Sequence, residues 1–98
     1  MINFKSYQNE IDMICQKYQV KNLTVFGGAL SEKFDESSDI DFLLELKTAE
    51  GGIKRYMNLK FELEQLFSRP VDLVMPKAIK NKLLKSYMFS NTREVYAA

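Results

Sequence analysis

Histidine is absent from this 98-residue sequence, and cysteine occurs once, as Cys15. A single cysteine cannot form a disulfide within the chain. Zinc sites in proteins draw mainly on cysteine and histidine side chains, so a zinc site is not expected. Cys15 itself lies in an amphipathic stretch and is interpreted as a small core residue.

Long apolar runs are also missing. No segment approaches the roughly 20 apolar residues that a membrane helix needs. The N-terminal stretch MINFKSYQNEIDMI is too polar for a signal peptide. The sequence therefore predicts a cytoplasmic protein without a membrane partner. Its length suits one domain with one core, so we expect residues 1–98 to form a single domain.

The chain has no large excess of either charge, with 14 basic and 13 acidic residues and a net charge of +1. Strong nucleic-acid binding is therefore not expected, because it usually needs a basic excess. The charge is nevertheless uneven: Ala29–Glu50 holds seven acidic and two basic residues, and Pro76–Ala98 five basic and one acidic. An acidic and a basic segment could serve a metal–triphosphate site, although chance clustering is the commoner explanation.

Periodicity predicts alternating helices and strands. Apolar residues spaced three and four apart predict helices over Asn3–Tyr18, Ile53–Phe67 and Lys77–Met88. Short apolar runs predict strands over Leu23–Phe26, Ile40–Leu46 and Val71–Met75, and Ala29–Lys33 could add one helical turn. The last ten residues are ambiguous. This order predicts a small α/β (α+β) fold, with a mixed sheet of three or more strands and helices packed on one face.

Three aspartates stand at the starts of two predicted strands. Side chains alternate along a strand, so Asp39 and Asp41 face the same way. Their like charges repel unless a cation lies between them, and Mg²⁺ prefers such oxygen ligands. Alone, Asp-x-Asp is more often a turn cap and an exposed strand residue. Asp72 strengthens the metal hypothesis, because an aspartate inside an apolar strand must face solvent or a ligand.

Gly27 and Gly28 follow the first predicted strand. Glycines in such a turn let backbone N–H groups approach a phosphate. A tight turn that needs a positive φ is the simpler explanation for an isolated Gly-Gly pair. Here, however, the turn leaves one strand and the aspartate pair opens the next, so neighbouring strands would bring both to one triphosphate.

The spacing of these residues resembles that of the minimal nucleotidyltransferases of the DNA polymerase β superfamily. Their pattern is Gly-Ser, ten residues, Asp-x-Asp, and a third aspartate on a later strand. In this chain Gly27 and Gly28 precede the ten residues Ala29–Ser38, then Asp39-Ile40-Asp41, with Asp72 in P-V-D-L-V. The resemblance covers nearly the whole chain and implies the nucleotidyltransferase fold.

The resemblance also implies an activity. A hydroxyl acceptor would attack the α-phosphate of a nucleoside triphosphate, such as ATP, and pyrophosphate would leave. Asp39, Asp41 and Asp72 would hold Mg²⁺ or Mn²⁺, and Asp72 would also help to deprotonate the acceptor. Similar small domains act as antitoxins beside helical HEPN-type toxins, and a tyrosine of such a toxin is one proposed acceptor of AMP.

The chain departs from the family pattern in the phosphate loop. Gly28 replaces the family serine, and Ala29-Leu30-Ser31-Glu32 stands where typical members carry two arginines. Ser31 and Lys33 are the candidates to compensate, beside Gly27 and Gly28, in nucleotide binding. The alternative function is therefore an inactive or weak nucleotidyltransferase-like module that acts as an antitoxin by protein contact.

The helix predicted over Ile53–Phe67 carries apolar residues on two sides. One side is expected to face the core, and its members are Ile53, Tyr56, Leu59, Leu63, Leu66 and Phe67. Met57 and Phe61 are four residues apart and lie on a different side. Either a neighbouring segment covers them, or they contact a second chain, which could be another copy or a toxin-like partner.

Overall fold

Residues 2–27, 38–75 and 91–98 are described by a computed structural model of the chain. A 3₁₀ helix over Phe4–Tyr7 leads into α1, which spans Gln8–Lys17. The remaining elements are β1 (Val20–Phe26), β2 (Ile40–Leu46), α2 (Gly52–Phe67), β3 (Val71–Val74) and β4 (Thr92–Ala97). The predicted turn at Ala29–Lys33 and the predicted helix at Lys77–Met88 lie outside the described residues.

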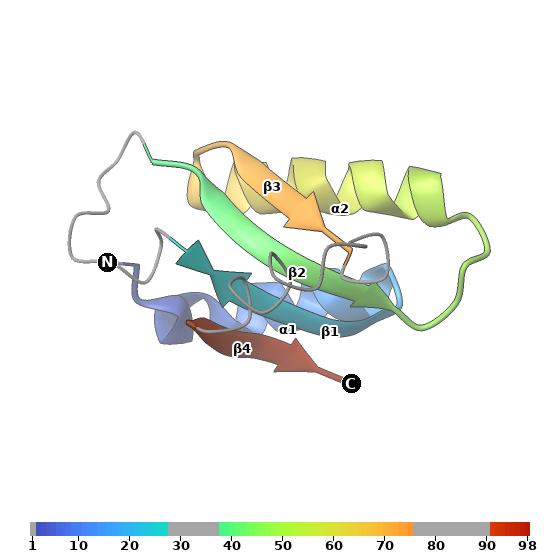
Figure 1. The fold of residues 1–98 in the computed structure, drawn as a ribbon, viewed down its shortest axis with the longest axis horizontal. Coiled ribbons are helices and arrows are strands. Elements are labelled where there is room, and N and C mark those ends of the chain that lie inside the picture. Colours follow the sequence, from blue (N-terminus) through green and yellow to red (C-terminus); the bar gives the residue numbers. More distant parts are fainter. Residues whose placement is uncertain (1, 28–37, 76–90) are drawn as a thin grey trace.

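Four strands form one mixed sheet in the order β3-β2-β1-β4 (Figure 1). β1 runs antiparallel to both β2 and β4, whereas β2 and β3 run parallel. Three of the strands match the predicted ones, but β1 begins at Val20, three residues before the predicted start. β4 was not predicted at all. It pairs with β1 and extends the sheet by one strand within the ambiguous C-terminal segment.

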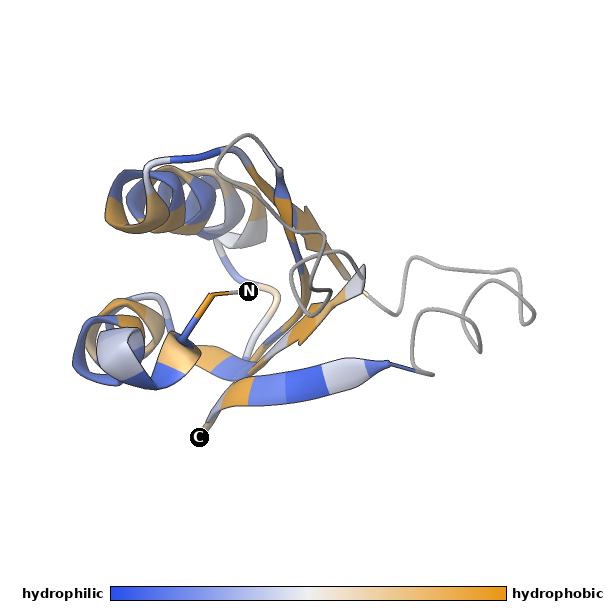
Figure 2. Cartoon of the chain, turned by 90° about the vertical axis from the view of Figure 1, so that its left-hand side faces the viewer, coloured by the Kyte–Doolittle hydropathy of each residue, from blue (hydrophilic) through white to orange (hydrophobic). Residues whose placement is uncertain are grey.

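Both helices pack on one side of the sheet, as predicted (Figure 2). α1 contacts β1 and β4, and α2 contacts β3 and α1. The core between the helices and the sheet is entirely apolar, and Cys15 is buried in it. Burial raises the pKa of the Cys15 thiol to about 12, so this thiol stays protonated and serves packing.

One face of α2 supplies the core contacts. Leu59, Leu63 and Phe67 are buried, and Tyr56 and Leu66 are partly buried against the same core. The expectation for Ile53 was wrong, because 85% of this residue is exposed. At about 100° per residue, Ile53 stands on the same side as Met57 and Phe61 rather than with Leu59 and Leu63. Of the two alternatives for Met57 and Phe61, cover by a neighbouring segment is wrong, because 57% and 61% of these residues are exposed.

Arg55 ties the start of α2 to two connections of the chain. Its Nε donates to the Tyr18 carbonyl at 2.9 Å and its Nη2 to the Gln19 carbonyl at 3.0 Å. Its Nη1 donates to the carbonyls of Thr48 and Glu50 at 3.0 and 2.8 Å. One guanidinium therefore donates to four backbone carbonyls, two in the connection that follows α1 and two in the connection that precedes α2.

We expect Arg55→Ala to destabilise the fold by about 2–3 kcal/mol, because hydrogen bonds from a charged group stabilise more than neutral ones. Arg55→Lys should recover only part of this, since an ammonium cannot reproduce the guanidinium fork. Urea denaturation of both variants measures the effect. Lys54→Ala, one residue earlier and exposed, is the control and should change stability by less than about 0.5 kcal/mol. Equal losses for Arg55→Ala and Lys54→Ala would contradict the assignment.

No helix within the described ranges 2–27, 38–75 and 91–98 combines the length and the apolar character needed to cross a membrane.

Candidate functional site

Asp41 and Asp72 meet across the parallel pair of strands. They are direct register partners in β2 and β3, and the preceding partners are Ile40 and Val71. Ile40 and Val71 are buried in the core that the helices cover. Because side chains alternate along a strand, Asp41 and Asp72 point to the opposite face of the sheet. Asp41 is partly buried there and Asp72 is exposed.

Asp39 precedes β2 by one residue and is exposed. Three effects raise the pKa of the Asp41 carboxyl: burial contributes most, then the negative charge of Asp72, then that of Asp39. The two neighbours therefore both act electrostatically on Asp41, which occupies the centre of the acidic group. Strand alternation predicted that Asp39 and Asp41 face the same way, and the position of Asp72 at the start of another strand led to the prediction that it joins them.

Gly27 lies against the same carboxylate. Phe26, the last residue of β1, is the register partner of Asp41. Gly27 follows with a φ of +73°, and a Cβ added to it would stand 3.5 Å from the Asp41 Oδ2 atom. The end of the first strand thus brings the glycine turn to the aspartates. Gly28, Ser31 and Lys33, the other candidate nucleotide contacts, lie outside the described residues.

The Arg69-Pro70 connection between α2 and β3 supports the start of β2. Nη1 of Arg69 donates to the Ser38 carbonyl at 3.4 Å, and the Ile40 N–H donates to the Pro70 carbonyl at 3.1 Å. These contacts hold the backbone on both sides of Asp39. The sequence signal for this contact was an arginine two residues before the strand that carries Asp72.

The carboxylate oxygens of Asp39, Asp41 and Asp72 suit a hard divalent cation. Within the described ranges, no three side chains of the types that bind metals converge into a formed centre. The paired carboxylates of Asp41 and Asp72, with Asp39 beside them, nevertheless offer only oxygen ligands, which Mg²⁺ and Mn²⁺ accept. A bound cation would offset the like-charge repulsion that raises the pKa of Asp41.

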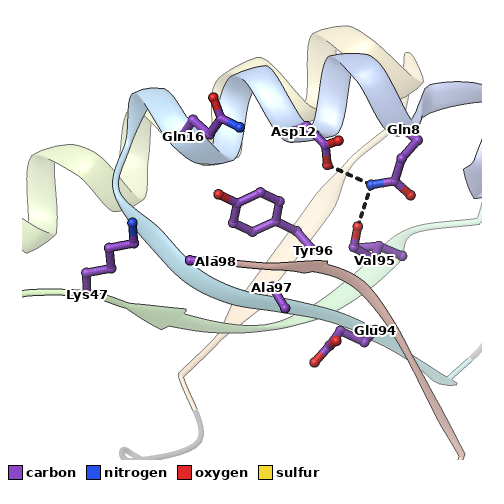
Figure 3. Close-up of a pocket in the computed structure, with 9 residues that line it drawn as sticks. All are labelled: Gln8, Asp12, Gln16, Lys47, Glu94, Val95, Tyr96, Ala97 and Ala98. Carbon is purple, nitrogen blue, oxygen red and sulfur yellow. Dashed lines mark hydrogen bonds between the residues drawn. The ribbon is translucent and has the colours of Figure 1, made fainter.

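A separate cavity of about 700 Å³ lies between α1 and β4, and it is not lined by Asp39, Asp41 or Asp72. In Figure 3 the Gln8 side chain bridges the Asp12 carboxylate and the Val95 carbonyl. Both hydrogen bonds measure 2.8 Å and fasten α1 to β4. This cavity is on the helical side of the sheet. The acidic group lies on the other face, so the two are distinct.

The comparison with known families decides the identity of this arrangement. Residues 10–95 match the model of the nucleotidyltransferase domain. The chain belongs to the nucleotidyltransferase domain family. The predicted family and fold class, a mixed sheet with helices packed on one face, are therefore confirmed.

Three proteins illustrate what this nucleotidyltransferase domain is similar to. One from Methanocaldococcus jannaschii, named "Putative protein adenylyltransferase", is 37% identical over 70 residues, which cover 71% of this chain and 70% of that protein. A solved toxin–antitoxin structure with AMP-PNP superposes with a TM-score of 0.71 at 18% identity, over 93% of this chain and 73% of the other.

The third is a tri-AMPylated HEPN toxin of Shewanella oneidensis in complex with its MNT antitoxin. The matched chain superposes with a TM-score of 0.61 at 14% identity, over 98% of this chain and 74% of the other. At these identities the solved structures show that the fold is shared.

Proposed function

We propose that this nucleotidyltransferase domain transfers AMP from ATP to a hydroxyl of a protein acceptor, namely a tyrosine of a HEPN-type toxin. The observation that supports this proposal most directly is the strand register that sets Asp41 opposite Asp72, with the Gly27 turn against the Asp41 carboxylate. Carboxylates beside a glycine turn suit a triphosphate bound with its metal. The adenylyltransferase name of the relative and the AMP-PNP and HEPN toxin in the similar structures support the choice of nucleotide and acceptor.

Each residue has a distinct role in this proposal. Asp39, Asp41 and Asp72 would hold Mg²⁺ or Mn²⁺, which neutralises charge on the phosphates when bound. The backbone at Gly27 and Gly28 presents N–H groups to phosphate oxygens. Ser31 and Lys33 supply further contacts to the triphosphate. Because Asp72 is exposed on the open face, an acceptor hydroxyl can approach it.

The chemical step is an in-line displacement at the α-phosphorus. The acceptor oxygen forms a bond to phosphorus as the bond to the β-phosphate bridging oxygen breaks. The hydroxyl proton passes to the Asp72 carboxylate, and pyrophosphate carries away the leaving electron pair. Catalysis of this kind rests mainly on positioning and on neutralisation of charge.

The direct test uses the whole chain, ATP labelled at the α-phosphate, Mg²⁺ and a HEPN-type toxin as the acceptor protein. Label should appear on that protein, and intact-mass and peptide analysis should place one AMP on a tyrosine. Label from ATP labelled at the γ-phosphate, and none from ATP labelled at the α-phosphate, would show phosphoryl transfer and contradict nucleotidyl transfer. Inhibition of the toxin without any label would instead support the alternative, an antitoxin that acts by protein contact. Gly28 in place of the family serine, and Ala29-Leu30-Ser31-Glu32 in place of the segment with two arginines, favour this alternative.

Gly27→Ala should reduce AMP transfer. A left-handed backbone conformation costs a residue with a Cβ roughly 1–2 kcal/mol, so the turn beside Asp41 should shift and the N–H groups should lose their alignment. We expect transfer to fall by about tenfold or more, since misplacement by 1 Å can cost roughly 100-fold. Initial rates with saturating Mg²⁺ measure this.

Gly51→Ala is the matched control. Gly51 also has a positive φ, +64°, and an added Cβ would stand 3.9 Å from Cδ of Arg55. The two substitutions should therefore lower the melting temperature by similar amounts, but only Gly27→Ala should lower the transfer rate measured well below both melting temperatures. Similar rates for the two variants would show that the Gly27 turn takes no part in transfer.

A further inference from the structure

Three exposed apolar side chains form a continuous stripe along α2. Ile53, Met57 and Phe61 follow one another at intervals of four residues. Their exposed fractions are 85%, 57% and 61%, respectively. Side chains four apart lie next to each other on a helix. We call these three residues the α2 stripe. Four large hydrophobic residues in the described part of the chain are exposed, and three of them belong to the stripe.

Neither the core nor α1 accounts for the α2 stripe. The core side of α2 is occupied by Leu59 and Leu63. The side toward α1 carries Glu62, which accepts a hydrogen bond from the Tyr18 hydroxyl and pairs with Lys17 at 3.2 Å. At about 100° per residue, the stripe lies roughly 140° around the helix from Glu62. It therefore faces away from α1, at the margin of the helical layer.

An apolar cavity continues the stripe at its N-terminal end. This cavity has a volume of about 770 Å³ and is formed where β2 runs into α2. Its apolar lining includes Leu44, Leu46, Tyr56 and Met75, and Ile53 contributes to both the cavity and the stripe. A ridge of apolar side chains that leads into an apolar cavity is the arrangement that accepts a helix with a protruding anchor.

Charge distinguishes between two candidates for the molecule that covers the α2 stripe, a second copy of this chain and a different protein. Lys54 and Lys60 flank the stripe, each about 60° from Met57 around the helix and on opposite sides. Neither lysine forms an ion pair with any described residue. In an antiparallel two-fold pairing of two copies centred on Met57, the two Lys54 side chains would share one edge of the contact and the two Lys60 side chains the other. Like charges in such positions oppose association, so a second copy is disfavoured.

We propose that the α2 stripe docks an amphipathic helix of a different protein, one with an apolar face and acidic residues on both flanks. The apolar face would cover Ile53, Met57 and Phe61 and place a large side chain in the adjoining cavity. The acidic flanks would pair with Lys54 and Lys60. This surface is independent of the aspartate site, so the proposal does not require that the domain be catalytically active.

The test uses two synthetic helical peptides as probes. Both carry leucine at intervals of three and four residues; one has glutamate on both flanks of the leucine face and the other has lysine. The glutamate peptide should bind the whole chain at least about tenfold more tightly, because flanking charge pairs select partners. Calorimetry gives the affinities, and amide chemical-shift changes should map to α2. Equal affinity for both peptides, or shifts confined to another surface, would overturn the proposal.

Variants sharpen the test. Phe61→Ser should abolish binding of the glutamate peptide, whereas Met13→Ser, which removes the one other large exposed apolar side chain of the described residues, should leave it unchanged. Lys54→Glu combined with Lys60→Glu should reverse the preference and favour the lysine peptide. Self-association of the unmodified chain in sedimentation experiments, if abolished by Phe61→Ser, would instead assign the stripe to a second copy and refute the proposal.

Discussion

Asp41→Asn is expected to abolish AMP transfer and, in the absence of metal, to stabilise the fold. Asp41 stands between the other two carboxylates, so an amide at this position would remove the central one of the three proposed metal ligands. Loss of one preorganised electrostatic contact at a reacting phosphate typically reduces the rate by roughly 100- to 1,000-fold, and we expect at least that here. Initial rates over a Mg²⁺ titration measure the loss.

The stability half of this prediction has the opposite sign because the folded chain accommodates the Asp41 charge poorly. Its carboxyl pKa is raised by burial and by Asp72 and Asp39, so the negative charge favours the unfolded chain at neutral pH. Asparagine keeps the shape and removes that charge. The melting temperature should therefore rise in EDTA, and added Mg²⁺ should raise it further for the natural chain but not for the variant.

Glu45→Gln is the matched control for Asp41→Asn. Glu45 lies four residues along β2 on the same face, but it faces Lys21 at 3.4 Å instead of another carboxylate. Removing its charge should leave transfer unchanged and should not stabilise the fold. If Asp41→Asn and Glu45→Gln shift the melting temperature alike, like-charge repulsion at Asp41 is not its cause. If Asp41→Asn retains full transfer, the proposed site is wrong.

The strands that could be predicted are those with strong local patterns. β2 is nearly continuous in apolar residues, and α2 repeats its core residues at helical spacing. β4 has the sequence TREVYA, and only Val95 is buried. Its strand character comes from pairing with β1, which lies about seventy residues earlier in the chain. A half-exposed edge strand of this kind has no local signal, because distant backbone hydrogen bonds determine it.

The aspartate site shows a similar division. Alternation along β2 was enough to predict that Asp39 and Asp41 face one way. It could not give the register that sets Asp41 opposite Asp72, because register depends on how β2 and β3 pair. Nor could it reveal that Arg69 contacts the backbone beside Asp39, since that contact joins two connections far apart in sequence. The local sequence pattern predicted the three aspartates as candidate metal ligands. The pairing of β2 with β3 sets Asp41 opposite Asp72.

Phe42→Ala is expected to destabilise the fold by about 3–5 kcal/mol, the usual loss for a buried phenylalanine. Phe42 is fully buried directly after Asp41. Its ring centroid lies 6.2 Å from that of Phe4, edge-on at 73°, and 6.2 Å from that of Phe67. For a domain of this size each kcal/mol shifts the melting temperature by roughly 4–8 °C, so a fall of at least about 12 °C should be seen.

Phe61→Ala makes the same chemical change on an exposed position, since 61% of Phe61 is accessible. It should alter the free energy of unfolding by less than about 0.5 kcal/mol, because nothing in the core loses a contact. Urea denaturation of the two variants side by side separates burial from residue type. Comparable losses would mean that Phe61 is packed within the monomer, which would also remove the basis for a docking surface on α2. A large loss for Phe42→Ala alone would show that the aromatic cluster under β2 stabilises the strand that carries Asp41.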